Sequence, residues 1–294
     1  MSIRTIQRIF AAKKTFEGSG FQVRRPFPTD AIPEIDPFLL LDEMGPTEHG
    51  PGEAQGAPDH PHRGFETVTY MLSGRMQHTD SHGNKGIIGP GDVQWMTAGD
   101  GIIHSEMPDE EFQAVGGKMH GIQLWINLPR QDKRMKPRYQ DISVNKIPKV
   151  TSPDGLIQAT VIAGNIFGVS AQIETRIPIT YLHLHIQPGG VFLQNFSPTA
   201  NVFAYILDGS GQFGEKMEEA SEGDIVIFAK NGENVKIATA PNATKKLNMI
   251  VLAGEPLNEP IARYGPFVMN TEKEILEAIT DYRNGRFGTI NTKN

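Results

Sequence analysis

The sequence predicts an all-β protein of sandwich or barrel type, built from two copies of one domain, with a single helix near its C-terminal end. Three observations support this fold class: short apolar runs separated by turn residues, two strand-and-turn motifs that recur at similar spacing, and one helix-capping motif. The chain has 294 residues, of which 31 are glycine and 21 are proline. Its hydrophobic fraction of 38% supports packed cores and excludes a largely disordered chain.

The predicted strands are short runs of apolar and β-branched residues that end at Gly, Pro, Asp or Asn. Runs of about four to eight such residues are typical of strands. They are Thr67–Leu72, Val93–Met96, Gly121–Leu128, Thr180–Ile186, Val202–Leu207, Asp224–Ala229 and Leu247–Ala253.

The predicted helix lies near residues 271–284. Thr271 and Glu274 have the spacing of a capping box, in which each residue satisfies a backbone N–H at the start of a helix. Ile275 and Ile279 follow at helical spacing.

Two motifs occur twice along the chain, which indicates an internal repeat. The segment Val68–Gly74 resembles Phe203–Gly209, and Gly91–Val93 resembles Gly223–Ile225 at nearly the same offset along the chain. In each copy a strand ends in a glycine turn, and a Gly-Asp turn then opens another strand. Two similar offsets predict two copies of one β-domain.

The boundary between the two copies is predicted near residue 137. The segment Gln131–Arg138 is polar, and Pro137 and Pro148 would interrupt strand pairing. We therefore assign residues 1–137 to an N-terminal domain and residues 138–294 to a C-terminal domain that carries the helix. Both have an ordinary domain size.

The composition excludes several classes of function. A net charge of −6 argues against a nucleic-acid-binding surface, and no Lys/Arg run indicates contact with a membrane. The absence of cysteine excludes disulfides and thiolate metal sites. No signal peptide or membrane-spanning apolar segment is visible. We expect a cytoplasmic monomer that contacts neither membrane nor nucleic acid directly.

Two pairs of candidate metal ligands stand well apart along the N-terminal half of the chain. His60 and His62 form one pair, and His104 and Glu106 form the other. On a β-strand, residues i and i+2 point to the same face. Two such pairs that face one another would make a four-ligand site of imidazole and carboxylate groups.

A further His-x-His pair, His183 and His185, lies outside the register of the first. The repeat offsets place the counterparts of the first ligand set near residues that could not complete a site, namely Asn195, Ser197, Lys236 and Ala238. His183 and His185 alternate with apolar residues, so we interpret them as the polar face of a strand. The second domain is therefore predicted to lack a metal.

The identity of the carboxylate ligand is open from the residues alone. Glu66 shares strand parity with His60 and His62 and follows them closely. Glu106 shares parity with His104. Either could complete the site.

The order of ligands and turns resembles the two motifs of the cupin superfamily, whose jelly-roll barrels hold a metal inside. A closer resemblance, to the pirin family, covers nearly the whole chain. The segments that carry it are His60–Thr67, Gly91–Gly99, Ile103–Met107, Gln123–Leu128, Gly254–Leu257 and Gly265–Thr271.

This resemblance implies two tandem cupin domains, with metal in the N-terminal barrel only. Pirin ligands are the histidines of His-Pro-His and the His and Glu of the later His-x-Glu. Transferred to this chain, these are His60, His62, His104 and Glu106. Glu66 would then support an imidazole from outside the ligand set.

A site of three imidazoles and one carboxylate suits Fe(II), and also Mn, Ni, Co or Cu. Since some pirins are quercetin 2,3-dioxygenases, the resemblance implies an oxidoreductase that opens a flavonol with O2. Glu106 would accept the proton of the substrate hydroxyl. The alternative is an iron-dependent, redox-sensing regulator that binds a protein partner without catalysis, as a transcriptional cofactor or a modulator of a metabolic enzyme.

Other histidines and both tryptophans have simpler interpretations. His78 and His82 flank a turn-like segment and are predicted to lie on the surface. Trp95 and Trp125 are predicted to pack in the core, where either could line a pocket.

Overall fold

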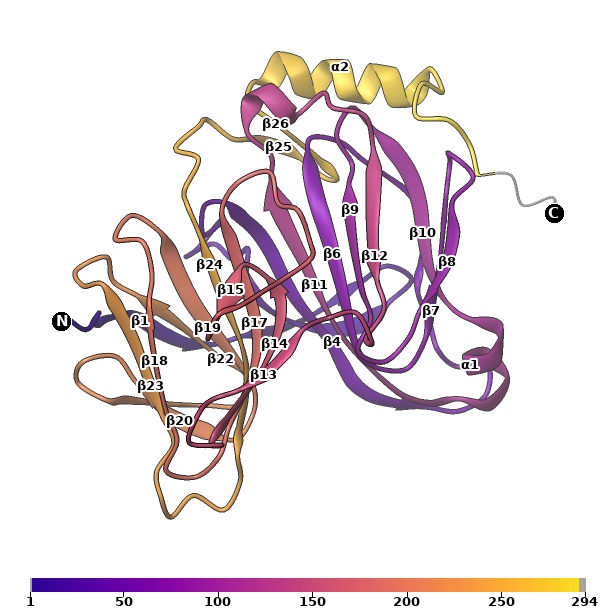
Figure 1. The fold of residues 1–294 in the computed structure, drawn as a ribbon. Helices are drawn as coiled ribbons and strands as arrows, with labels where there is room; N and C mark the ends of the chain where they lie inside the picture. The colour runs from indigo at the N-terminus through magenta and orange to yellow at the C-terminus, as the bar shows by residue number, and fades with distance from the viewer. Residues whose placement is uncertain (1, 291–294) are drawn as a thin grey trace. The chain divides into compact units, whose positions relative to one another are not determined.

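The structure is a computed structural model that describes residues 2–290. It divides into two compact units, each described here by itself. The first barrel comprises Lys14–Val144 and Leu257–Asn294. The second barrel comprises Met1–Lys13 and Asn145–Pro256. The predicted all-β fold with two cupin domains and a C-terminal helix is confirmed (Figure 1).

The first barrel is formed by two antiparallel sheets. The larger sheet has the order β12-β9-β6-β11-β4-β3-β2, and the smaller has the order β5-β10-β7-β8. Their strands are β2 (Lys13–Glu17), β3 (Phe21–Phe27), β4 (Phe38–His49), β5 (Ala57–His62), β6 (Phe65–Ser73), β7 (Met76–Asp80), β8 (Lys85–Ile88), β9 (Val93–Thr97), β10 (Ile102–Pro108), β11 (Gly117–Asn127) and β12 (Arg138–Ile142).

A hairpin, two short helical elements and one longer helix complete the first barrel. The hairpin of β25 (Ala262–Tyr264) and β26 (Phe267–Met269) leads into α2 (Glu272–Arg283). The short helix α1 (Glu110–Val115) and the 3-10 turn η1 (Arg130–Asp132) lie in loops. Figure 1 shows α2 and the hairpin together at one end of this barrel.

The second barrel also has two main sheets. Their orders are β1-β22-β19-β24-β17-β14-β13 and β18-β23-β20-β21, beside a small hairpin of β15 and β16. The strands are β1 (Ile6–Ala11), β13 (Lys149–Thr151), β14 (Ile157–Ala163), β15 (Asn165–Ile166), β16 (Val169–Ser170), β17 (Ile179–Ile186), β18 (Val191–Asn195), β19 (Asn201–Asp208), β20 (Ser210–Phe213), β21 (Glu218–Ser221), β22 (Asp224–Phe228), β23 (Asn234–Ala238) and β24 (Leu247–Gly254).

The predicted repeat is visible in the strand order. The run β9-β6-β11-β4 of one barrel corresponds to β22-β19-β24-β17 of the other, and every strand predicted from the sequence is present. Glycine occupies the same turn positions in both copies because these turns have positive φ values. Gly74 and Gly209 have φ values of 81° and 84°, and Gly91 and Gly223 have values of 85° and 84°. Residues with a side chain rarely adopt this left-handed conformation.

The two compact units are not separated by a single boundary such as the one predicted at residue 137. The N-terminal strand β1 pairs with β22, so the segment that ends at Lys13 belongs to the second barrel. Residues from Leu257 onward belong to the first barrel. Each terminal segment therefore joins the barrel that is more distant in sequence, because a sheet edge can be paired by any segment that reaches it.

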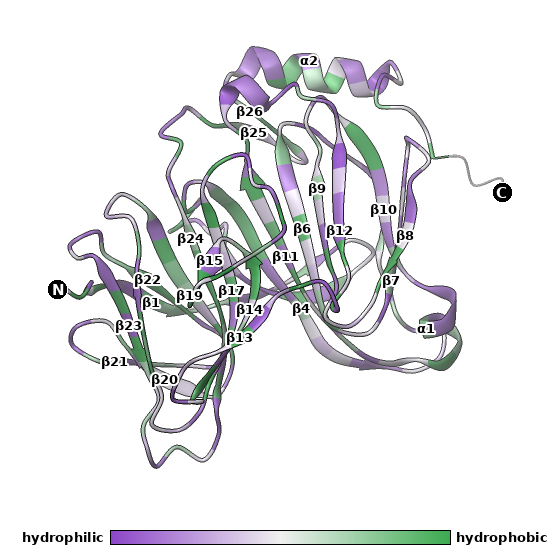
Figure 2. Cartoon of the chain, in the orientation of Figure 1, coloured by the Kyte–Doolittle hydropathy of each residue, from purple (hydrophilic) through white to green (hydrophobic). Residues whose placement is uncertain are grey.

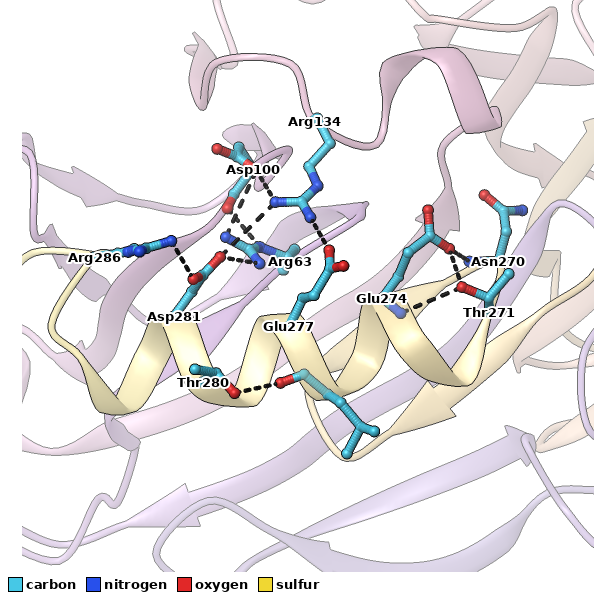
Figure 3. Close-up of polar contacts among 11 residues, drawn as sticks. Arg63, Asp100, Arg134, Asn270, Thr271, Glu274, Glu277, Thr280, Asp281 and Arg286 are labelled. Carbon is cyan, nitrogen blue, oxygen red and sulfur yellow. Dashed lines mark hydrogen bonds and ion pairs between the residues drawn. The ribbon is translucent and has the colours of Figure 1, made fainter.

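Helix α2 begins as the capping box predicts. The Thr271 hydroxyl accepts a hydrogen bond from the Glu274 backbone N–H at 3.3 Å, and Glu274 Oε2 accepts from the Thr271 hydroxyl at 2.8 Å and the Asn270 N–H at 3.1 Å (Figure 3). These contacts satisfy donors that the first helical turn leaves unpaired. Within the described chain, no helix is long and apolar enough to cross a membrane.

An apolar cluster occupies the interior of the second barrel. On β17 the alternate residues Leu182, Leu184 and Ile186 belong to this cluster, which leaves His183 and His185 on the opposite face. In Figure 2, green hydrophobic bands run along the strands of both barrels, whereas most loops are purple or white.

The strand register of the second barrel shows which positions of its small sheet point inward. In the β18–β23 ladder of the second barrel, Phe192 lies opposite Ile237, and both are fully buried in the apolar cluster. The residue at the simple offset from His104 is Lys236, which is not part of the cluster. A shift of one residue moves a side chain to the other face of a sheet, so a sequence offset alone cannot assign the inward position.

Candidate metal centre

Three histidines meet on two neighbouring strands of the first barrel. His60 and His62 lie at the end of β5, and His104 lies on β10. The two strands pair antiparallel, with His104 directly opposite His60. One potential ligand atom from each residue lies within 4.8 Å of the others. The ladder thus supplies the facing arrangement that sequence spacing could only suggest.

The three imidazole rings are packed closely, and several of their nitrogens lack hydrogen-bond partners. Ring centroids are 4.4 Å apart for His60 and His104, 4.7 Å for His60 and His62, and 4.9 Å for His62 and His104. His62 and His104 are 2% and 1% exposed. His62 Nδ1 and both ring nitrogens of His104 have no hydrogen-bond partner in the described structure. Buried polar atoms without partners are costly, so this donor set is consistent with a divalent metal.

Both buried imidazoles favour their neutral, metal-binding form. Burial lowers the pKa of His62 and of His104 well below the usual value, and neighbouring imidazoles lower it further. His60 Nδ1 lies 2.7 Å from the Pro58 carbonyl oxygen and donates its proton there. This hydrogen bond leaves His60 Nε2 as the nitrogen with a free lone pair.

Glu106 lies on β10 two residues after His104, but its carboxylate is not part of the three-histidine group. Its Oε1 accepts a hydrogen bond from the Thr69 hydroxyl at 2.7 Å, and its Oε2 accepts from Gln123 Nε2 at 3.2 Å. The β5–β10 ladder shifts register between His104 and Glu106. Glu106 therefore has a defined orientation, and it lines the same cavity as His60 and His62.

Glu66 lies on a different strand from the first histidine pair. A turn at Arg63 and Gly64 separates β5 from β6, so the parity that Glu66 shares with His62 in sequence does not continue in space. Its Oε1 accepts a hydrogen bond from the Thr97 hydroxyl at 2.6 Å. Alternation along β6 places Glu66 on the opposite face from Thr69, which contacts Glu106.

A cavity of about 500 Å³ adjoins the histidines. Trp125 forms part of its wall, and its ring lies 5.2 Å from His62 and 4.5 Å from Phe65. The Arg263 guanidinium lies over the Trp125 ring at 5.2 Å. Further lining residues, mostly apolar or charged, include Phe21, Arg25, Leu40, Asp42, Met44, Met76 and Gln123.

The prediction that His78 lies on the surface is wrong. His78 is on β7, is 1% exposed, and lies opposite Glu106 in the β7–β10 ladder. Its ring is 5.5 Å from His104 and 4.7 Å from Tyr139. The turn begins only after Asp80, so His78 belongs to the preceding strand. The alternation of Met76, His78 and Asp80, which are all buried, was the available signal.

Both tryptophans and His82 lie where the sequence predicts them. Trp95 is fully buried in the core, whereas Trp125 lines the cavity. His82 is exposed in the turn after β7. In the second barrel, His183 Nε2 lies 2.7 Å from Asn248 Oδ1, and His183 is not part of the three-histidine group.

A jelly-roll barrel with converging imidazoles, together with a second barrel filled by apolar side chains, defines a bicupin with one candidate metal centre among the described residues. Comparison with family models then identifies the group. The pirin model matches residues 20–126, and the model of the pirin C-terminal cupin domain matches residues 181–288. The chain belongs to the pirin family, as its motifs predicted.

Individual relatives match along nearly the whole chain. A pirin-like protein of Solanum lycopersicum is 42% identical over 97% of this chain and 93% of its own length. A putative quercetin 2,3-dioxygenase of Pseudomonas aeruginosa is 38% identical over 94% and 95%. A crystal structure of a quercetin 2,3-dioxygenase from Acinetobacter baumannii matches with a TM-score of 0.91 and 34% identity, covering 99% of this chain and all of that one.

Proposed function

We propose that the protein is a metal-dependent dioxygenase that opens the ring of a flavonol such as quercetin with O2. The observation that carries the proposal is the group of three imidazoles beside a cavity of about 500 Å³. Cavities of roughly 300–1,000 Å³ hold ligands of this kind. The quercetin 2,3-dioxygenase from Acinetobacter baumannii supports the choice of substrate class.

The metal would be held by His60, His62, His104 and Glu106. This donor set suits Fe(II), and Mn, Ni, Co or Cu are alternatives. When bound, such an ion supplies Lewis-acid and electron-transfer chemistry toward the flavonol and O2.

Glu106 acts as the proton acceptor in this proposal. A flavonol reacts through its deprotonated 3-hydroxyl group, so a carboxylate must take up that proton. The Thr69 hydroxyl donates a hydrogen bond to one oxygen of Glu106, and the Gln123 amide donates to the other. They restrict the rotation of the carboxylate, so less orientation remains to be lost on substrate binding.

Trp125 provides a flat wall for the aromatic rings of the substrate. Its ring contacts the His62 ring, and the Arg263 guanidinium lies over it. Leu40, Met44 and Met76 contribute apolar surface to the same cavity. Contact with the indole and with these side chains would bury the flavonol and exclude water.

The test is turnover by protein loaded separately with Fe, Mn, Ni, Co and Cu. We expect O2-dependent loss of quercetin and release of CO with at least one metal. His104→Ala should reduce turnover to background because it removes one imidazole from the centre. His185→Ala, on the outer face of β17, is the matched control and should retain activity. Failure of all five metals contradicts the proposal and leaves the regulatory alternative.

A further inference from the structure

We propose that Arg63 and Asp281 are positioning residues for the metal centre, through which helix α2 holds the ligand strand β5 in place. The inference rests on the metal site of the proposed function but not on flavonol turnover. It connects His62, in the N-terminal half of the sequence, to a helix near the C-terminal end.

The ligand strand needs such a restraint because it is the terminal strand of its sheet. The order β5-β10-β7-β8 gives β5 a single ladder among the described strands, with β10. His62 is the last residue of β5, and Arg63 follows directly. A short edge strand paired on one side is held less firmly than a central strand. Contacts at its end therefore influence where His60 and His62 point.

Arg63 makes these contacts with a side chain that is only 2% exposed. Nη1 donates to Asp281 Oδ2 at 2.9 Å, and Nε donates to the Asp100 carbonyl oxygen at 2.6 Å (Figure 3). The guanidinium also lies over the Phe287 ring at 4.6 Å. Arg63 Nη2 also lies 3.6 Å from Asp100 Oδ1, and Asp281 also pairs with Arg286 at 2.7 Å. Asp281 is thus the carboxylate nearest to a guanidinium that is buried from water, and its removal would weaken, without abolishing, the compensation of the Arg63 charge.

The backbone of the same turn is bound to the C-terminal segment. The Arg63 N–H donates to the Pro266 carbonyl at 3.3 Å, and the Val268 N–H donates to the Arg63 carbonyl at 3.0 Å. Gly64 has a φ of 89°, and a Cβ at this position would lie 2.0 Å from the Val268 carbonyl oxygen. The ligand strand and the β25–β26 hairpin are thus in direct backbone contact.

The buried Lys133 reinforces this contact. Its Nζ donates to the Gly64 carbonyl at 2.9 Å, the Val268 carbonyl at 2.9 Å and Asn127 Oδ1 at 2.7 Å. One ammonium group therefore joins the turn after His62 to the hairpin before α2. Lys133 and Arg63 thus attach the end of β5 to the C-terminal segment. These contacts add to the ladder that β5 forms with β10.

Coupling of this kind is reciprocal. If docking of α2 favours the metal-binding arrangement of His60 and His62, then metal binding must favour docking of α2 by the same free energy. This gives two independent measurements, one of metal affinity in variants and one of helix stability in the unaltered protein.

The first measurement is the affinity of the full-length protein for nickel(II), determined by competition with a chelator. We expect Asp281→Asn and Arg63→Lys each to weaken binding about tenfold, the lower end of the effect of residues that support metal ligands. Glu277→Gln is the matched control. Glu277 lies on the same helix as Asp281, and the substitution removes only its exposed ion pair with Arg134, at 2.7 Å. This variant should bind nickel as the unaltered protein does.

The second measurement is amide hydrogen exchange of the unaltered protein with and without nickel. We expect slower exchange in residues 275–283 of α2 on metal loading. Because this measurement uses the unaltered protein, it tests the inference even where a variant does not fold. Unchanged exchange in α2, or unchanged nickel affinity in both variants, overturns the inference. Failure of the unaltered protein to bind nickel would instead contradict the metal site of the proposed function.

Discussion

The two barrels share a strand order but fill their interiors in opposite ways. In the first, the ladder of the small sheet places His60 opposite His104. In the second, the corresponding ladder places Phe192 opposite Ile237, within an apolar cluster. One fold therefore accommodates either a polar ligand set or a continuous apolar core on the same pair of strands.

The two kinds of interior contribute differently to stability and to metal binding. Packed Phe and Ile side chains stabilise a barrel directly, by about 1.5–3 kcal/mol for each fully buried side chain. Buried imidazole nitrogens without partners are destabilising by about 1–3 kcal/mol each, unless a ligand satisfies them. The second barrel thus has no need of a metal, whereas the first has a site that a metal would stabilise.

The largest expected effect comes from removing one member of the apolar pair. Phe192→Ala should lower the free energy of unfolding by about 3–5 kcal/mol, because it leaves a cavity in a packed core. The size of the loss should be the same with and without metal. Urea denaturation followed by circular dichroism measures it.

His104→Ala is the counterpart in the first barrel. It should abolish the increase in stability on metal addition while changing the metal-free protein much less than Phe192→Ala does. Equal losses from both substitutions in metal-free protein would show that the histidines are structural, like the phenylalanine.

A medium effect is expected from acid. The folded pKa values of His62 and His104 lie well below their unfolded value near 6.5, so below that pH the unfolded state binds more protons. Metal-free protein should lose about 1.4 kcal/mol per pH unit for each histidine until the folded pKa is reached.

His185 in the second barrel must be separated from this effect. Burial lowers its pKa to about 4, so it contributes in the same direction, although less because it is partly exposed. Unfolding curves from pH 7 to pH 5 for His104→Gln and His185→Gln distinguish the two barrels. A larger reduction of the pH dependence in His185→Gln would contradict the assignment to the metal centre.

The smallest effect is expected from the histidine pair on the outer face of the second barrel. His183→Gln should change the free energy of unfolding by about 0.5–1.5 kcal/mol, through its hydrogen bond with Asn248. Metal content, measured by elemental analysis, should remain one ion per chain. A loss of bound metal would show that the two barrels do not divide their roles in this way.

Much of the fold could be predicted because its signals are local. Alternating apolar residues and left-handed glycine turns act within a few positions, so the strands, the repeat and the capping box of α2 were all recoverable. His78 was not, because its burial depends on where β7 ends rather than on its neighbours in sequence.

The sequence by itself identified the three histidines that meet in the first barrel, the segments that form strands, and the repetition of the domain. Only the tertiary structure decided that His104 faces His60, that Glu66 lies away from Glu106, and that each terminal segment joins the more distant barrel. The same holds for the contact of Arg63 with Asp281, which lie 218 residues apart in the sequence. Strand formation follows from the preferences of neighbouring residues, whereas ladders, registers and buried ion pairs exist only once distant segments have met.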